Sequence, residues 1–258
     1  MSATTGEGAH ERTRRRYLAL LRSALTDVVY ETTYDATSGA FVAPSSTAQG
    51  NVFPPRAVTM VGWRRLDNVR AALEDVVRRG VPGDFMETGV WRGGACIYAK
   101  AVLDSLSGQR RRVIVADSFR GLPPPDVTRH PADAGDAHHT NTYLAVSEAE
   151  VRANFRRFDV LDDAVVFHAG FFAQSFAPGK RMPFERLAVL RLDGDMYGST
   201  MDVLNAAYDA VSPGGYVIVD DYALAGARRA VDDFRASRRI ASPLHAVDWT
   251  GVYWIKDA

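Results

Sequence analysis

Apolar residues follow a helical spacing in the first quarter of this chain and mostly form short runs afterwards. Over about 10–30, the segment RYLALLRSALTDVVY places apolar residues three and four positions apart, which predicts an amphipathic helix. Residues 1–9 are small and polar, and a disordered start is expected there. Residues 31–56 are rich in Ser, Thr, Gly and Pro and are expected to form a loop. A second helix is predicted over 64–80.

Apolar runs then alternate with helical spacings. The predicted strands are GDFMETG, RRVIVADSF, AVVFHAG, RLAVLRLDGD and GGYVIVDDY, and helices are predicted over 93–106, 147–158, 198–211 and 224–238. This alternation is typical of an α/β fold with a mostly parallel sheet covered on both faces. The segments LHAVDW and GVYWIK predict a closing antiparallel hairpin with its turn near 250–251.

The overall charge is balanced, because 31 Lys and Arg residues match 31 Asp and Glu residues among 258. A nucleic-acid partner therefore has no support from net charge. Cys96 is the only cysteine, which excludes an intrachain disulfide and a cysteine-based zinc site. We find neither a signal peptide nor an apolar run of about 18 residues, so a cytoplasmic protein without membrane association is expected.

The first predicted strand of the alternating region leads into a glycine-rich turn. In DFMETGVWRGGACIYAK, Glu87 ends the strand, and Gly89, Gly93 and Gly94 precede a helix. Glycines permit a tight turn and a close approach of a ligand to the backbone, and the helix offers free N–H groups. The spacing matches neither a P-loop nor the dinucleotide fingerprint. Such a turn also occurs without any ligand, so this feature alone decides little.

The next strand ends in Asp117, where a carboxylate is placed to accept both hydroxyls of a ribose. Together with the glycine turn, this acid predicts a nucleoside ligand whose other end carries an amino-acid group. The loop offers no cluster of basic residues for a polyphosphate. S-adenosylmethionine (SAM) fits this combination.

Two later strands also end in acids: Asp193 follows one, and Asp220 and Asp221 follow the other. A buried carboxylate is costly unless it is paired, hydrogen-bonded or bound to a metal. Because ligands of open α/β sheets lie at the carboxyl ends of the strands, these acids are expected to share a crevice with Glu87. A set of oxygen donors favours Mg²⁺ or Mn²⁺. Alternatively, Asp195 and Asp221 could cap the helices that follow.

Two further features allow more than one interpretation. In the long segment 120–146, His138 and His139 lie near acidic residues and could form a metal cluster, a catalytic pair or a solvated loop. We favour the loop, and contact with the substrate is the second interpretation. Trp249 is expected to pack in the core or on the edge strand, although an aromatic residue near the cleft could stack on a sugar.

A SAM molecule and a divalent cation in one cleft predict O-methyl transfer. The cation would bind an acceptor hydroxyl and lower its pKa, and Asp193 could accept the proton. A catechol or phenol acceptor fits the same site. A non-catalytic nucleoside-binding protein and a metal-dependent hydrolase are the remaining alternatives. The hydrolase would need a stronger phosphate cradle.

The ordered motifs of this chain resemble those of the macrocin O-methyltransferase family, whose members methylate deoxysugar hydroxyls of glycosylated antibiotics. The motifs lie between about 58 and 256 and read TMVGWRRLDNV, METGVWRGGACIYAKAVL, DSFRGLPPPD, LRLDGDMYGST, GGYVIVDDY and WTGVYW. The resemblance implies a Rossmann-like SAM-dependent methyltransferase fold over 58–258, preceded by a helix and a lid or oligomerisation segment over 1–57. It also implies SAM as methyl donor, Mg²⁺ with Mn²⁺ possible, a small-molecule glycoside as substrate, and a dimer or tetramer.

The resemblance assigns roles to residues by motif. It makes Asp193, Asp220 and Asp221 the metal ligands and Asp193 the proton acceptor. The residues implied to contact SAM are Thr59, Met60, Glu87, Thr88, Gly89, Gly93, Asp117, Ser118, Ser147, Gly170, Phe172 and Asp193. The N-terminal region is expected to shape the acceptor pocket.

Overall fold

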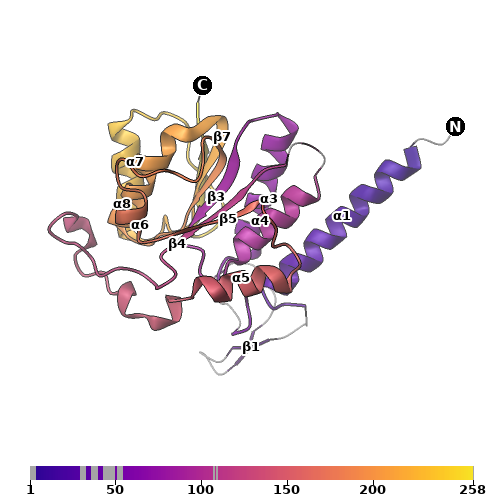
Figure 1. The fold of residues 1–258 in the computed structure, drawn as a ribbon, viewed down its shortest axis with the longest axis horizontal. Helices are drawn as coiled ribbons and strands as arrows, with labels where there is room; N and C mark the ends of the chain where they lie inside the picture. The colour runs from indigo at the N-terminus through magenta and orange to yellow at the C-terminus, as the bar shows by residue number, and fades with distance from the viewer. Residues whose placement is uncertain are drawn as a thin grey trace.

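The centre of the protein is a seven-stranded sheet with the strand order β5-β4-β3-β6-β7-β9-β8 (Figure 1). The computed structural model describes residues 4–29, 33–35, 40–42, 50, 55–106, 108 and 110–257. The strands are β3 (Asp84–Thr88), β4 (Val113–Asp117), β5 (Val165–Ala169), β6 (Leu187–Leu192), β7 (Val211–Val219), β8 (His245–Ala246) and β9 (Val252–Ile255). The first five strands of that order run parallel, and β9 is antiparallel to both β7 and β8. The predicted α/β fold and closing hairpin are confirmed.

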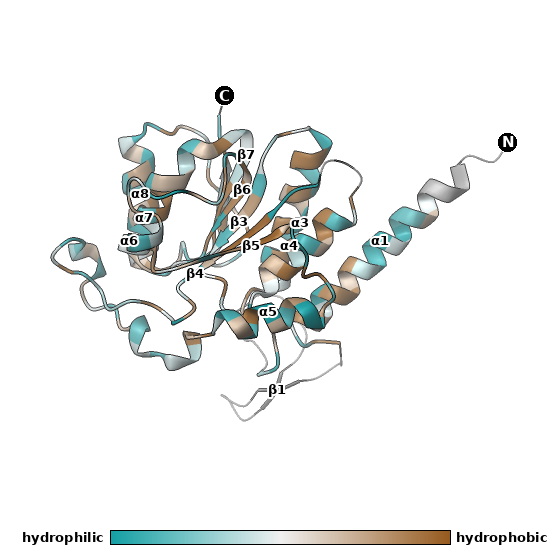
Figure 2. Cartoon of the chain, in the orientation of Figure 1, coloured by the Kyte–Doolittle hydropathy of each residue, from teal (hydrophilic) through white to brown (hydrophobic). Residues whose placement is uncertain are grey.

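Helices cover both faces of the sheet, as the apolar strands require. They are α1 (Thr4–Leu25), α3 (Trp63–Arg78), α4 (Gly94–Asp104), α5 (Glu148–Arg157), α6 (Phe172–Ser175), α7 (Tyr197–Ala207) and α8 (Ala225–Ser237), with short 3₁₀ helices at Pro131–Asp133, His138–Thr140, Thr142–Leu144 and Tyr208–Ala210. One apolar core joins α1, α3, α4 and α5 to one face of the sheet. A second core joins α7 and α8 to the other face. Figure 2 shows the apolar strands between these two layers.

The N-terminal helix differs from its prediction at both ends. It begins at Thr4, so the expectation of disorder is wrong from that residue onward. The first residues of the chain are small and polar, so no apolar spacing indicates a helix there. A helix can nevertheless continue beyond its last buried side chain, because its backbone hydrogen bonds lie within the helix itself. It ends at Leu25 rather than near 30, because Asp27 adopts a left-handed backbone conformation with φ 55°. In Figure 1, α1 projects from the body of the protein.

Part of the predicted loop over 31–56 is a small antiparallel pair formed by β1 (Thr33–Asp35) and β2 (Ala40–Val42). Strands of three residues are too short to leave a recognisable alternation. Positions 31–32, 36–39, 43–49 and 51–54 of this segment lie outside the described residues. No helix among the described parts of the chain has the length and apolar character needed to cross a bilayer.

Candidate active site

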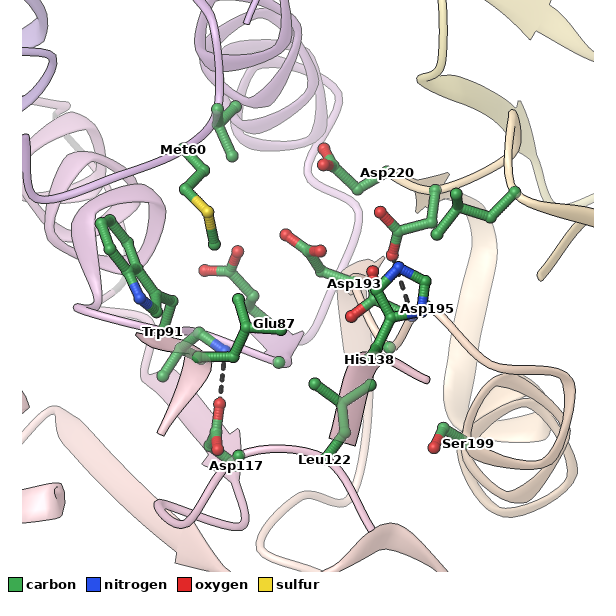
Figure 3. A pocket seen from close by; sticks show the side chains of 18 of the residues that line it. Met60, Glu87, Trp91, Asp117, Leu122, His138, Asp193, Asp195, Ser199 and Asp220 are labelled. Carbon is green, nitrogen blue, oxygen red and sulfur yellow. Dashed lines mark hydrogen bonds between the residues drawn. The ribbon is translucent and has the colours of Figure 1, made fainter. Parts of the chain in front are cut away.

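A cleft of about 420 Å³ opens at the carboxyl ends of the parallel strands (Figure 3). Its lining comes mainly from the segments after β3, β4, β5, β6 and β7, from those before α3 and β9, and from the long segment 120–146. In Figure 3, Asp193, Asp195 and Asp220 lie on one side, Met60, Trp91 and Asp117 lie on the other, and Glu87 lies between them. The predicted convergence of the strand-terminal acids is therefore observed.

Strand register explains why the acids meet on one face of the sheet. Glu87 of β3 pairs with Arg191 of β6, and Arg191 pairs with Ile218 of β7. Directly paired residues of neighbouring strands share a face, and side chains alternate faces along each strand. Asp193 and Asp220 each lie two positions beyond one of these residues, so they continue the same face. This face is the one that α3 and α4 cover.

Arg191 connects three of these acids. Its side chain is fully buried. Nη1 donates to Oε1 of Glu87 and, over 2.8 Å, to Oδ2 of Asp193, while Nη2 donates to Oδ1 of Asp220. Our prediction treated β6 only as an apolar strand and missed this residue. The available signal was a single charged residue inside that strand, two positions before an acid.

Arg65 brings a second positive charge from α3. Its Nη1 donates to Oδ2 of Asp220, and its Nε donates to Oδ2 of Asp248 over 2.9 Å. The side chain is only 7% exposed. Both oxygen atoms of Asp220 are thus held by guanidinium groups, one from the sheet and one from a helix that is distant in sequence.

Asp193, Asp220 and Asp221 form the group that we call the acid cluster. Each contributes an oxygen atom that lies within 4.8 Å of the other two. An octahedral Mg²⁺ holds its ligands at about 2.1 Å, so adjacent ligand oxygens lie about 3 Å apart and opposite ones about 4 Å apart. Small side-chain rotations would bring the three oxygens to such spacings, and each carboxylate oxygen has two lone pairs. The acid cluster therefore fits a magnesium ion with its remaining positions open.

The alternative in which Asp195 and Asp221 cap helices is wrong. Helix α7 begins after Met196 and α8 after Leu224, and neither of these residues makes a side-chain cap. Asp221 instead accepts a hydrogen bond from the backbone N–H of Asp195 over 3.0 Å. Asp133 serves α7, since its two oxygens accept from the first backbone N–H groups of that helix over 2.6 and 2.9 Å.

Burial and crowding shift the titration of these acids. Burial and the nearby Asp220 raise the pKa of Asp193 to about 8, although Arg191 acts in the opposite direction. Burial, with the charges of Asp195 and Asp193, raises the pKa of Asp221 well above its ordinary value. Burial also raises the pKa of Glu87, again against the influence of Arg191. Each of these three acids therefore keeps its proton to a higher pH than a solvent-exposed carboxyl group does.

On the opposite side of the cleft, backbone N–H groups hold the carboxylate of Asp117. Oδ2 of Asp117 accepts from the N–H of Val90 over 2.7 Å, and Oδ1 accepts from the N–H of Phe119 over 2.8 Å. Gly89 has φ +82°, and an added Cβ would lie 1.6 Å from the carbonyl oxygen of Asp193. Only glycine therefore lets the ends of β3 and β6 approach this closely.

The structure divides the predicted SAM contacts into two groups. Those that line the cleft are Thr59, Met60, Glu87, Gly89, Asp117, Ser118, Phe172 and Asp193, whereas Thr88, Gly93, Ser147 and Gly170 lie outside its lining. The second group has structural contacts: Gly93 precedes α4 with φ 86°, and the hydroxyl of Ser147 accepts from the N–H of Glu150 at the start of α5.

Two residues for which the sequence allowed more than one interpretation lie on the open side of the cleft. Trp249 lines the cleft and is 57% exposed, so the expectation that it packs in the core or on the edge strand is wrong. His138 lines the cleft as well, and Oδ2 of Asp136 lies 2.8 Å from its Nδ1. These positions come from loops, where no periodic pattern indicates the direction of a side chain.

The sequence profile of the macrocin-O-methyltransferase (TylF) family matches residues 1–256. The chain belongs to the macrocin O-methyltransferase family. It is 44% identical over 249 residues to mycinamicin III 3''-O-methyltransferase of Micromonospora griseorubida, covering 94% of this chain and 96% of that protein. It is 45% identical over 246 residues to demethyldecarbamoylnovobiocin O-methyltransferase of Streptomyces niveus, covering 92% of each.

Solved structures agree with this family assignment. The O-methyltransferase NovP superposes with a TM-score of 0.83 at 41% identity, covering 95% of this chain and 100% of that chain. The calicheamicin methyltransferase CalS11, at 18% identity and a TM-score of 0.60, shares the fold. This macrocin O-methyltransferase family member is thus an O-methyltransferase on the SAM-dependent methyltransferase fold. The family assignment favours an enzyme over the non-catalytic alternative.

Proposed function

We propose that this protein transfers the methyl group of SAM to a deoxysugar hydroxyl of a glycosylated natural product, with Mg²⁺ at the acid cluster and Asp193 as proton acceptor. One observation carries the proposal: a rigid acid suited to a ribose and an acid cluster suited to a divalent cation line a single cleft. The family membership supports the reaction type, and the named activities of the relatives support a glycoside acceptor.

SAM would lie on the side of the cleft that Gly89 and Asp117 form. Two backbone N–H groups fix the Asp117 carboxylate. Because these donors are neutral, the carboxylate keeps its charge and its remaining lone pairs for the ribose hydroxyls. We place the methionine end toward Thr59, Met60 and Glu87, which line the cleft. In Figure 3, Met60 and Glu87 lie nearer Asp193 than Asp117 does.

Asp193, Asp220 and Asp221 would hold the cation, which can be Mg²⁺ or Mn²⁺. When bound, it supplies Lewis-acid polarisation of the acceptor hydroxyl. Arg191 holds one oxygen atom of Asp193 and so fixes its carboxylate at the cleft. The acceptor oxygen attacks the methyl carbon as the carbon–sulfur bond breaks, the proton passes to Asp193, and the sulfur leaves without charge.

The acceptor would enter on the open side, where Leu122, His138, Ser199 and Trp249 line the cleft. An exposed indole ring offers an apolar face to a sugar ring or an aglycone. The imidazole of His138, oriented by Asp136, offers a hydrogen-bonding group. This mixture of apolar and polar groups suits a hydroxylated glycoside.

The test combines binding and turnover. Isothermal titration measures SAM and then Mg²⁺, and radiolabelled SAM then reports methyl transfer to mycinamicin III, to demethyldecarbamoylnovobiocin and to a simple catechol. We expect binding of both ligands, transfer to a glycoside, and loss of transfer in EDTA that Mg²⁺ restores. SAM binding without metal binding would reject the mechanism, and transfer to the catechol alone would favour the phenol alternative.

We also propose a cytoplasmic dimer or tetramer in which residues 1–57 assist the site as a lid or contact segment, while 58–258 form the methyltransferase domain. Helix α1 supports this, because it projects from the body and exposes Tyr17 and Leu20. Light scattering of the full chain and of a double variant Tyr17→Ser, Leu20→Ser, which removes the exposed apolar side chains, tests it. An unchanged mass would reject the role of the projecting helix.

A further inference from the structure

Arg191 is an unusual residue for the middle of a sheet. Its side chain has no exposed surface, and it lies in a strand whose other residues are apolar. An unpaired buried charge would strongly disfavour the folded state. Here the guanidinium bonds to Glu87 in β3, to Asp193 directly after β6 and to Asp220 directly after β7, which are three adjacent strands. Two of these three acids belong to the acid cluster.

We propose that Arg191 is the internal counter-ion and positioning residue of the acid cluster, which keeps Asp193 and Asp220 in place before a divalent cation binds. The inference rests on the proposed function, because it assigns the cation to the acid cluster. Carboxylates this close repel one another, and a positive charge between them removes much of that repulsion. Arg191 and the cation would then act on the same two carboxylates and partly replace each other.

The contacts distinguish Arg191 from Arg65, which is also a buried cation of the site. Arg65 bonds to Asp220 and Asp248, so it holds only one member of the acid cluster. Arg191 bonds to Asp193 and Asp220 through different nitrogen atoms, which sets the position of one relative to the other. It also bonds to Glu87, which links this arrangement to the part of the cleft assigned to SAM.

Lys100 provides a matched control. It is also a buried cation, 2% exposed, and it bridges two acids, Asp104 and Asp162. Neither it nor its partners line the cleft. Replacing Lys100 therefore removes a buried charge with two partners and leaves the acid cluster untouched.

The experiment measures thermal unfolding of the full chain at pH 8, in EDTA and in MgCl₂. We expect Arg191→Met to lower Tm by about 10 °C in EDTA, since breaking a buried ion pair is strongly destabilising. Mg²⁺ should recover at least half of that loss, because the cation takes over the role of the missing charge. Lys100→Met should also lose stability, and Mg²⁺ should not restore it.

Arg191→Lys separates charge from geometry and serves if Arg191→Met fails to fold. A lysine keeps the charge but cannot reach three acids with a planar fork. We expect its Mg²⁺-dependent rise in Tm to equal that of the wild type, and its methyl transfer to fall at least tenfold. A Mg²⁺ response as large as that of Arg191→Met would overturn the proposal, since charge would then not matter.

Titration of the wild type with Mg²⁺ separates the two levels of inference. If the wild type binds Mg²⁺ but the Tm of Arg191→Met does not recover, the counter-ion role is wrong and the cation site stands. If the wild type does not bind Mg²⁺, the cation site itself is rejected, and the counter-ion role with it.

Discussion

Asp117 and Asp220 end or follow parallel strands of the same sheet and line the same cleft, yet different groups hold them. The carboxylate of Asp117 accepts two backbone N–H groups. The carboxylate of Asp220 accepts from the guanidinium groups of Arg65 and Arg191. The first acid is fixed by neutral donors of the main chain, and the second by charged side chains.

The difference matches the ligands that we assign to the two sides. Neutral donors leave the charge of Asp117 uncompensated, which favours strong hydrogen bonds from neutral hydroxyls. The guanidinium groups compensate the charge of Asp220 before a cation binds, and the arginine side chains can move when it does. A carboxylate at a strand end can thus be prepared for either kind of ligand by the donors around it.

The largest effect is expected on the cation side. Asp193→Asn removes both the proton acceptor and a charged ligand, and methyl transfer should fall about 10³-fold, within the range of general-base losses. SAM affinity should change by less than about threefold, since one of many contacts is altered. Radiolabelled transfer and titration calorimetry measure the two quantities. Retained turnover would show that Asp193 is not the base.

The backbone support of the nucleoside side can be broken at Gly89. Gly89→Ala places a Cβ 1.6 Å from a carbonyl oxygen at φ +82°. We expect a loss of about 3 kcal/mol in the free energy of unfolding, measured by thermal or urea denaturation. Gly135→Ala is the control, because it has φ +87° but no atom within 4 Å of the new Cβ. Equal losses in both variants would mean that backbone strain, and not the clash, dominates.

A reciprocal pair of variants tests the comparison directly. Asp117→Asn should weaken SAM about 10- to 100-fold and leave Mg²⁺ affinity unchanged, because a charged hydrogen-bond acceptor becomes neutral. Asp220→Asn should weaken Mg²⁺ by a similar factor and leave SAM unchanged. Calorimetry of both ligands with both variants gives the four dissociation constants. If each variant weakens both ligands equally, the two sides of the cleft do not act independently.

The smallest effect concerns the open side of the cleft. Trp249→Ala should raise the acceptor KM about fivefold, the size of one aromatic stacking contact, without changing kcat or SAM affinity. Trp249→Phe keeps an aromatic ring, so its acceptor KM should stay close to that of the wild type. Steady-state kinetics with the best acceptor distinguish these results, and an unchanged KM in the alanine variant would remove Trp249 from the acceptor site.

Most of the fold could be read from the sequence because its strands are apolar runs and its helices carry apolar faces. The errors lie where this signal is missing. The start of α1 has no apolar periodicity, and β1 and β2 are too short to show alternation. The capping of α7 by Asp133 was missed because the acid comes from a different segment of the chain.

The sequence alone determined that Glu87, Asp117, Asp193 and Asp220 would meet, because the carboxyl ends of parallel strands share one edge of the sheet. Only the tertiary structure decided what surrounds them. Arg65 reaches Asp220 from a helix that precedes every strand of the main sheet, and Arg191 meets Glu87 through the register of two strands. The pattern of apolar and polar residues along a strand indicates which face of the sheet a side chain lies on. The partners of a buried charge, in contrast, depend on contacts between segments that are distant in sequence.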